Sequence, residues 1–285
     1  MEQRKIATGT NSHATGSRDM TVERSRPARA ARGEVVVELP KHDESSLFRE
    51  VYSTAAIASA FGLLLWHVVQ LVSSVGLSAW WLPLAVLCGM AAADFVSGMV
   101  HWTADTWGSE QMPILGRRLV HPFRVHHVNP DDFLRRRFID TNGDVSMLAI
   151  PILLAIGWVP LEIWWGGMLR VFVVSFGAIG LLTNQVHQWA HMTTPPRFIR
   201  LLQRCGILLS RPAHDRHHVS PYVENYCIAT GWCNRPLSAV RFFRKLERLV
   251  TLLTGLQPRQ DDAAFQANVE SMPAAQTVEQ GGRNG

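Results

Sequence analysis

Apolar and polar residues are distributed very unevenly along this chain of 285 residues. Four stretches are almost uncharged, and each is close to the length of about 20 apolar residues that a helix needs to cross a bilayer. They cover residues 54–75, 79–100, 147–165 and 169–187. The pattern predicts an all-α, polytopic membrane protein with four transmembrane helices.

The polar segments between and around these stretches predict the organisation of the chain. Short turns at residues 74–78 and 166–167 would close the four spans into two helical hairpins. Residues 1–50 are polar and lack the apolar core of a secretory signal peptide. They and residues 257–285 have the composition of disordered tails. We therefore expect one membrane domain, residues 51–256, between two tails.

The basic residues predict how the spans are oriented. Of 28 Lys and Arg, only Arg170 lies in or next to the short connections after the first and third spans. Basic residues accumulate on the cytoplasmic side of membrane proteins, so both termini and the loop 102–146 are expected there. The net charge is +5, and no nucleic-acid motif accompanies it. The basic residues are therefore expected to contact anionic lipid headgroups, and no nucleic-acid partner is expected.

Two further stretches combine arginines with apolar residues at helical spacing. These are residues 197–204 and 241–250. A basic face opposite an apolar face is typical of a helix that lies in the headgroup region of a membrane. The alternative is an ordinary amphipathic helix that packs on soluble neighbours.

Nine of the twelve histidines fall in four short clusters, and all four clusters lie on the predicted cytoplasmic side. The basic residues alone predict the orientation of the spans, so the position of the histidines on one side is independent support for it. The clusters are HWTAD with His101, HPFRVHH with His121, His126 and His127, HQWAH with His187 and His191, and HDRHH with His214, His217 and His218.

The spacing within these clusters indicates metal binding. Residues three or four apart share a helix face, so His187 and His191 can address one point, as can His101 and the Asp105 carboxylate. Imidazole is the commonest metal ligand in proteins, and a site of many nitrogens with one carboxylate suits iron, zinc or copper. One zinc ion needs about four ligands. Nine histidines and Asp105 therefore predict a di-metal site at the cytoplasmic face.

The other histidines carry simpler interpretations. His67 lies inside the first span and is expected to be a hydrogen-bonded structural residue. His13 and His42 lie in the predicted N-terminal tail and receive no role.

Acidic residues near the clusters could support the site. Asp94 lies within the second span, seven residues before His101, and an ionisable group there is costly and usually functional. It is expected to orient a ligand imidazole, or else to make a structural hydrogen bond. Asp140, Asn142 and Asp144, in FIDTNGD, could help frame the site, but the Asn-Gly pair there predicts a turn and the start of a helix.

Long consecutive motifs give these residues a family resemblance. They are DFVSGMVHWTADTWGS, HPFRVHHVNPDDF, FIDTNGD, NQVHQWAHM and RPAHDRHHVSPYVENYCIATGWCN, within residues 91–237. The chain resembles the plasmanylethanolamine desaturase family, also called Kua or CarF, and by this resemblance is identified as a bacterial CarF-type member. That resemblance implies an enzyme of the bacterial inner membrane that converts the alkyl ether chain of a phospholipid into a vinyl ether, which defines a plasmalogen.

The resemblance also implies the cofactors and ligands. The family's histidine boxes correspond to His187–His191 and His214–His218, supported by His101, Asp105, His121, His126 and His127. Two iron ions and molecular oxygen are expected, because unactivated C–H bonds require an oxidant that side chains do not supply. No flavin or nicotinamide motif is present, so the electrons would come from a cytochrome b5-like protein or a ferredoxin.

Two other functions fit parts of the same pattern. One is di-iron desaturation or hydroxylation of an acyl chain in another phospholipid. The other is a non-enzymatic membrane sensor or transporter that binds zinc or haem. A transporter would place its ligands near the bilayer midplane, where only His67 lies, and haem would leave doublets such as His126–His127 without a role.

Overall fold

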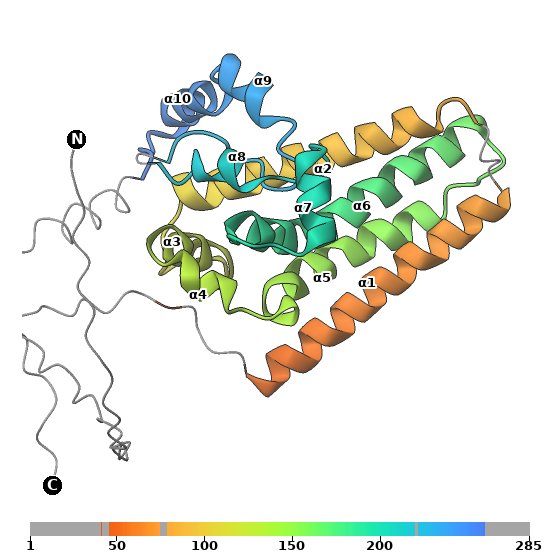
Figure 1. The fold of residues 1–285 in the computed structure, drawn as a ribbon, viewed down its shortest axis with the longest axis horizontal. Helices are drawn as coiled ribbons and strands as arrows, with labels where there is room; N and C mark the ends of the chain where they lie inside the picture. Colours follow the sequence, from red (N-terminus) through yellow and green to blue (C-terminus); the bar gives the residue numbers. More distant parts are fainter. Residues whose placement is uncertain (1–40, 42–45, 75–78, 220–221, 260–285) are drawn as a thin grey trace, which may run out of the picture. The chain divides into compact units, whose positions relative to one another are not determined.

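Four long helices form the body of the protein (Figure 1). The computed structural model describes residues 41, 46–74, 79–219 and 222–259, and across these residues every regular element is helical. The four helices that are long and apolar enough to cross a membrane are α1 (Leu47–Ser74), α2 (Leu82–Thr106), α5 (Phe138–Gly157) and α6 (Trp164–His191). The prediction of an all-α protein with four membrane-spanning helices is confirmed.

Small residues let these helices approach closely, as is usual between helices in membranes. Helix α2 packs along α6, and α1 along α5. A Cβ atom added at Gly89 of α2 would lie 2.9 Å from the Cβ atom of Ser175 and 3.0 Å from the backbone nitrogen of Phe176 in α6. At Gly143 of α5 an added Cβ atom would meet Ser53 of α1.

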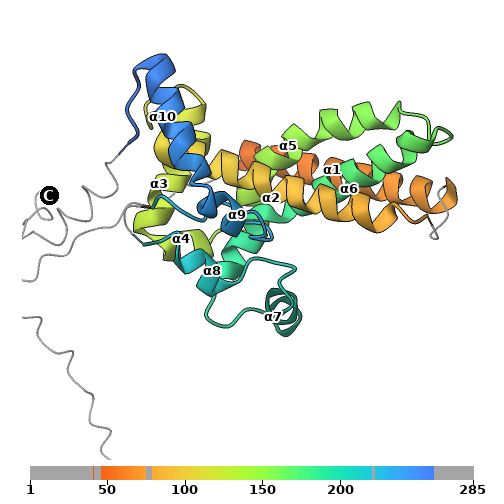
Figure 2. The same cartoon turned by 90° about the horizontal axis from the view of Figure 1, so that it is seen from above.

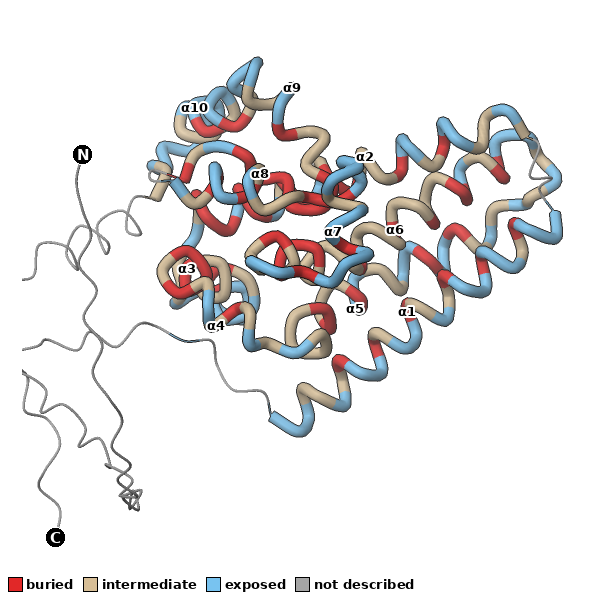
Figure 3. The backbone as a smooth tube through the Cα atoms, viewed as in Figure 1, coloured by how far each residue is buried: buried red, intermediate tan, exposed pale blue. Residues whose placement is uncertain are grey.

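The outward faces of the helices are apolar. Figure 3 shows that much of α1 is exposed, and its exposed side chains include Leu65, Val69 and Val72. Contiguous exposed apolar surface is unfavourable in water and marks a contact surface. On four helices of this length it identifies an integral membrane protein.

The third span begins and ends earlier than predicted. Helix α5 begins at Phe138, nine residues before the predicted span, because the Asp140 carboxylate accepts the backbone N–H of Arg137 at 3.1 Å and caps the helix. The helix ends at Gly157, whose carbonyl oxygen accepts a hydrogen bond from Arg170 at 3.1 Å. The connection to α6 therefore covers residues 158–163.

Two turn predictions were consequently wrong. Gly166 and Gly167 lie inside α6, not between two spans. Asn142 and Gly143 lie inside α5, where the Asn142 side chain is fully buried and donates a hydrogen bond to the Phe138 carbonyl oxygen at 2.9 Å. Intrahelical bonding and close contact with α1 outweigh the local turn preference of Asn-Gly.

The shorter elements gather toward the end of the bundle where α2 and α6 end (Figures 1 and 2). Helices α7 and α10 confirm the helices predicted at residues 197–204 and 241–250, and their position in the headgroup region stays a prediction. The predicted tails lie outside the described residues, apart from residues 41, 46–50 and 257–259, and so do His13, His42 and residues 75–78 of the first predicted turn. The shorter elements are the π-helix η1 (Gly116–Val120) and helices α3 (His121–Val128), α4 (Pro130–Leu134), α7 (Arg197–Arg204), α8 (Arg211–Asp215), α9 (Asn234–Ala239) and α10 (Phe242–Thr254).

Candidate metal centre

Four segments bring metal-ligand side chains together at this end of the bundle. Helix α2 supplies His101 and Asp105, and α6 supplies His187 and His191, in each case one turn apart on one helix face. The other two segments are α3 and the stretch from α8 to residue 218. The side chains form two groups, and within each group one ligand atom of every residue lies within 4.8 Å of those of the others.

The first group, called here the five-histidine group, consists of imidazoles alone. Its members are His126, His187, His191, His214 and His218. The Nε2 atom of His214 lies 2.8 Å from those of both His187 and His191. The Nε2 atom of His126 lies 3.0 Å from that of His191 and 3.1 Å from that of His218. All five rings thus turn the same nitrogen inward.

The second group, called here the aspartate group, surrounds a carboxylate. One oxygen of Asp105 lies 3.2 Å from the Nε2 atoms of His101 and His127 and 3.3 Å from that of His217. Asp105 is nearly inaccessible to solvent, and its three partner imidazoles are buried. Three nitrogens and one carboxylate oxygen make a donor set that suits a transition metal.

The two histidine doublets connect the groups. His126 belongs to the five-histidine group, whereas its neighbour His127 belongs to the aspartate group. In the second doublet His218 belongs to the first group and His217 to the second. The ring centroids of His127 and His218 are only 5.2 Å apart. Each doublet therefore spans two adjacent sites.

Backbone carbonyls fix the orientation of two rings in the aspartate group. The Nδ1 atom of His101 donates a hydrogen bond to the carbonyl oxygen of Tyr226 at 3.1 Å, and that of His217 to the carbonyl oxygen of Glu224 at 2.8 Å. With the proton on Nδ1, the Nε2 atom carries a lone pair directed at the centre of the group. Such partners set both the tautomer and the direction of a metal-binding histidine.

Burial keeps the imidazoles uncharged. Desolvation, reinforced by the nearby His187, lowers the pKa of both His126 and His214 well below the ordinary value of 6.5. Burial likewise lowers the pKa of His218. Neutral imidazole is the form that binds metals, so these rings are ready to act as ligands at neutral pH.

The donor atoms of both groups fit metal ions. A neutral imidazole has one N–H, so five converging Nε2 atoms cannot satisfy one another by hydrogen bonds. In the aspartate group the Nε2 atom of His101 and both Asp105 oxygens are buried without a hydrogen-bond partner. Buried polar atoms in this condition are costly, and one cation in each group would satisfy them.

His121 and His67 lie apart from both groups. The Nδ1 atom of His121 pairs with the Glu110 carboxylate at 3.0 Å, and the side chain is partly exposed. The structure therefore does not bring His121 to the other predicted ligands. His67 is fully buried and donates to the Leu153 carbonyl oxygen at 2.8 Å, which confirms its structural interpretation.

Asp94 holds a loop and not an imidazole. One carboxylate oxygen accepts the backbone N–H groups of Ala229, Thr230 and Gly231 at 2.8–3.2 Å, and the other accepts that of Cys233 at 2.9 Å. The expectation that Asp94 orients a ligand ring is corrected to its alternative, a structural hydrogen bond. The same loop begins near the Tyr226 carbonyl, which sequence spacing did not identify as the partner of His101.

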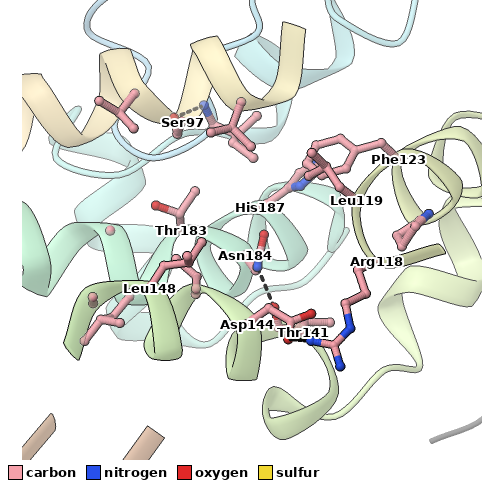
Figure 4. A pocket seen from close by; sticks show the side chains of 18 of the residues that line it. Ser97, Arg118, Leu119, Phe123, Thr141, Asp144, Leu148, Thr183, Asn184 and His187 are labelled. Atoms are coloured by element: carbon pink, nitrogen blue, oxygen red, sulfur yellow. Dashed lines mark hydrogen bonds and ion pairs between the residues drawn. The ribbon is translucent and has the colours of Figure 1, made fainter. Parts of the chain in front are cut away.

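A cavity of about 400 Å³ opens beside the five-histidine group. His126 and His187 line it together with Phe133, and apolar residues of α2, α5 and α6 form another part of its wall. Figure 4 shows Leu148, His187 and Arg118 around the cavity. Four arginines also line the cavity: Arg49 of α1, Arg117 and Arg118 of η1, and Arg136 between α4 and α5. The cavity thus has three parts: a charged part with the arginines and Asp144, called here the mouth, the histidines of the five-histidine group, and the apolar part between α2, α5 and α6, called here the channel.

Comparison with known proteins assigns this arrangement to a family. The lipid desaturase domain matches residues 90–261, which include every residue of both groups. The chain belongs to the lipid desaturase family. It is 44% identical to a plasmanylethanolamine desaturase of Myxococcus xanthus over 217 residues, which cover 75% of this chain and 76% of the relative. This membrane protein is therefore a desaturase, an enzyme of the oxidoreductase class.

Relatives in animals and plants extend the same comparison. The chain is 38% identical to plasmanylethanolamine desaturase 1 of Mus musculus, over 66% of this chain and 71% of the relative. It is 33% identical to the chloroplastic fatty acid desaturase 4 of Arabidopsis thaliana, over 62% of this chain and 54% of the relative. No solved structure gives a significant match.

The geometry predicts which histidines a metal requires. Replacing His187 or His214 with Ala removes a ligand from the five-histidine group. Metal affinity is expected to fall by more than the roughly 10- to 100-fold that follows when only an orienting partner of a ligand is lost. Replacing His121 with Ala should leave the metal content unchanged. Elemental analysis of the purified variants measures both. Equal metal content in all of them would contradict the assignment.

Proposed function

We propose that this protein desaturates the alkyl ether chain of plasmanylethanolamine to a vinyl ether, producing a plasmalogen. The observation that carries the proposal is the cavity that leads from a charged mouth past His126 and His187 into an apolar channel. The 44% identity to the Myxococcus protein of that name supports the choice of substrate. The reaction removes two hydrogens from adjacent carbons: alkyl ether, O2, two electrons and two protons give vinyl ether and two molecules of water.

The proposed ligands are the five-histidine group and the aspartate group, and the proposed metals are two iron ions. Bound iron would supply the oxidant for C–H bonds, using molecular oxygen. The chain's own residues bind and orient the substrate. The cavity walls position the alkyl chain beside His126 and His187, and the rings of Phe133 and His187, with centroids 4.9 Å apart, exclude water there.

The dimensions of the cavity suit a lipid chain that enters from the membrane surface. Asp144 and Leu153 both line the cavity and are nine residues apart on α5, which is about 14 Å at the rise of an α-helix. Charged residues gather at one end of the bundle, and we propose that this end and both termini face the cytoplasm of a bacterial inner membrane. An external carrier, cytochrome b5-like or a ferredoxin, would then deliver the two electrons from that side.

Desaturation of an acyl chain is the second candidate. It is favoured by the 33% identity to the Arabidopsis fatty acid desaturase 4. The two reactions leave different products, because a vinyl ether is cleaved by mild acid and an acyl double bond is not.

Lipid analysis tests the proposed reaction. Expression in a bacterial host that is supplied with alkyl ether lipid should yield acid-labile vinyl ether lipid, and the His187→Ala and His214→Ala variants should yield none, because the metal centre would be lost. The Cys205→Ser variant changes an exposed side chain outside the cavity and both metal-ligand groups, so it serves as the control and should retain the product. New acyl double bonds without vinyl ether would favour the second candidate.

The length of the channel gives a separate prediction. Gly180 of α6 lines the cavity, and a Cβ atom added there would meet no atom within 4 Å. The Gly180→Leu variant should therefore fold normally, but its side chain should fill the space that the alkyl chain occupies. The yield of vinyl ether from long chains should fall by about tenfold relative to that from short chains, because a loss of about 1.4 kcal/mol in binding free energy corresponds to that factor.

The control for this variant is Gly62→Leu. An added Cβ atom at Gly62 of α1 also meets nothing within 4 Å, but Gly62 does not line the cavity. Gas chromatography of the aldehydes released from vinyl ether lipid measures chain length directly. An unchanged chain-length profile in Gly180→Leu would show that the substrate does not use this channel.

A further inference from the structure

The mouth of the cavity carries charges of both signs. Arg49 of α1, Arg118 of η1 and Asp144 of α5 all line it. A guanidinium nitrogen of Arg118 lies 3.0 Å from one Asp144 oxygen, and a guanidinium nitrogen of Arg49 lies 3.6 Å from the other. Figure 4 shows Arg118 and Asp144 facing each other at the cavity wall. Three elements that are far apart in the sequence therefore form one charged cluster.

This cluster remains accessible. The side chains of Arg49, Arg118 and Asp144 are 29%, 42% and 36% exposed. The nearby Asp140 differs, because its side chain is only 9% exposed and is bound by the side chain and backbone N–H of Arg137. Asp144 is thus the carboxylate at the mouth that a ligand can reach.

We propose that Arg49, Arg118 and Asp144 form a receptor for a zwitterionic phosphoethanolamine headgroup, a specificity that rests on the proposed function. The arginines bind the phosphate, for which the guanidinium fork has matching geometry. Asp144 accepts hydrogen bonds from the primary ammonium. The ligand's two charges replace the arginine–aspartate pairing, so no charge at the mouth is left without a partner, which would be costly.

The position of the cluster suits this role. The same cavity connects it to His126 and His187. When the headgroup is bound at the mouth, the first carbons of the ether chain lie beside the five-histidine group. The cluster therefore determines which lipid is accepted and also which carbons are presented.

The chemistry of the headgroup predicts a definite order of preference. A primary ammonium donates three hydrogen bonds, as the ammonium of lysine does, whereas the quaternary ammonium of choline donates none and a glycerol headgroup has no positive charge. Asp144 should therefore favour ethanolamine over both, and the arginines should favour all three phospholipids equally.

Binding of three alkyl ether lipids that differ only in headgroup tests the proposal. Native mass spectrometry of the full chain should show wild-type protein retaining the ethanolamine lipid in preference to the choline and glycerol lipids. Asp144→Asn should reduce that preference by about fivefold, the effect of one partly exposed ion pair. Asp144→Glu should restore it. Asp215→Asn, which removes an exposed acid paired with Arg211 outside the cavity, is the matched control and should change nothing.

Soluble competitors give a second readout on the wild-type protein alone. Phosphoethanolamine should displace the ethanolamine lipid better than phosphocholine or inorganic phosphate does. Equal retention of the three lipids by wild type, or an Asp144→Asn variant with unaltered preference, would overturn the proposal. Turnover is measured separately: wild-type protein that prefers ethanolamine lipid but forms no vinyl ether would contradict the proposed function and leave the receptor supported.

Discussion

The structure depends on one costly constraint: the donor atoms of eight imidazoles and one carboxylate converge on two points, and all of these side chains are buried except the half-buried His191 and His218. Hydrogen bonds among the rings cannot satisfy these atoms, since each neutral imidazole has a single N–H. A cation at each of the two points would offset this cost. The surrounding elements are arranged around that requirement: α2 and α6 provide rigid pairs of ligands one helical turn apart, and two doublets each divide between the adjacent groups.

The membrane-spanning helices give this centre access to a lipid. The ligands on α2 and α6 lie at the same end of the bundle as the first residues of α1 and α5, which contribute the charged mouth of the cavity. The apolar channel continues between α2, α5 and α6. A lipid can therefore keep its headgroup at the surface while its chain lies along the histidines. This arrangement is consistent with a desaturase that acts close to the headgroup.

Sequence alone predicted the features that local spacing determines. The pairs His187–His191 and His101–Asp105 share helix faces, and the four apolar stretches became four helices. Spacing could not predict how the doublets divide, because this depends on how α3 and α8 pack against the bundle. For the same reason it could not separate His121 from the ligands, since Glu110, its partner, carries no signal in the sequence. The early start of α5 and the role of Asp94 likewise depend on contacts with distant segments.

We infer that the two groups bind two separate metal ions. Anomalous X-ray diffraction from crystals of the iron-loaded protein, recorded at the iron absorption edge, would locate these ions. Two peaks are expected in the protein, one among the Nε2 atoms of the five-histidine group and one beside Asp105, with neither next to His121. A single peak, or peaks away from these side chains, would contradict this inference.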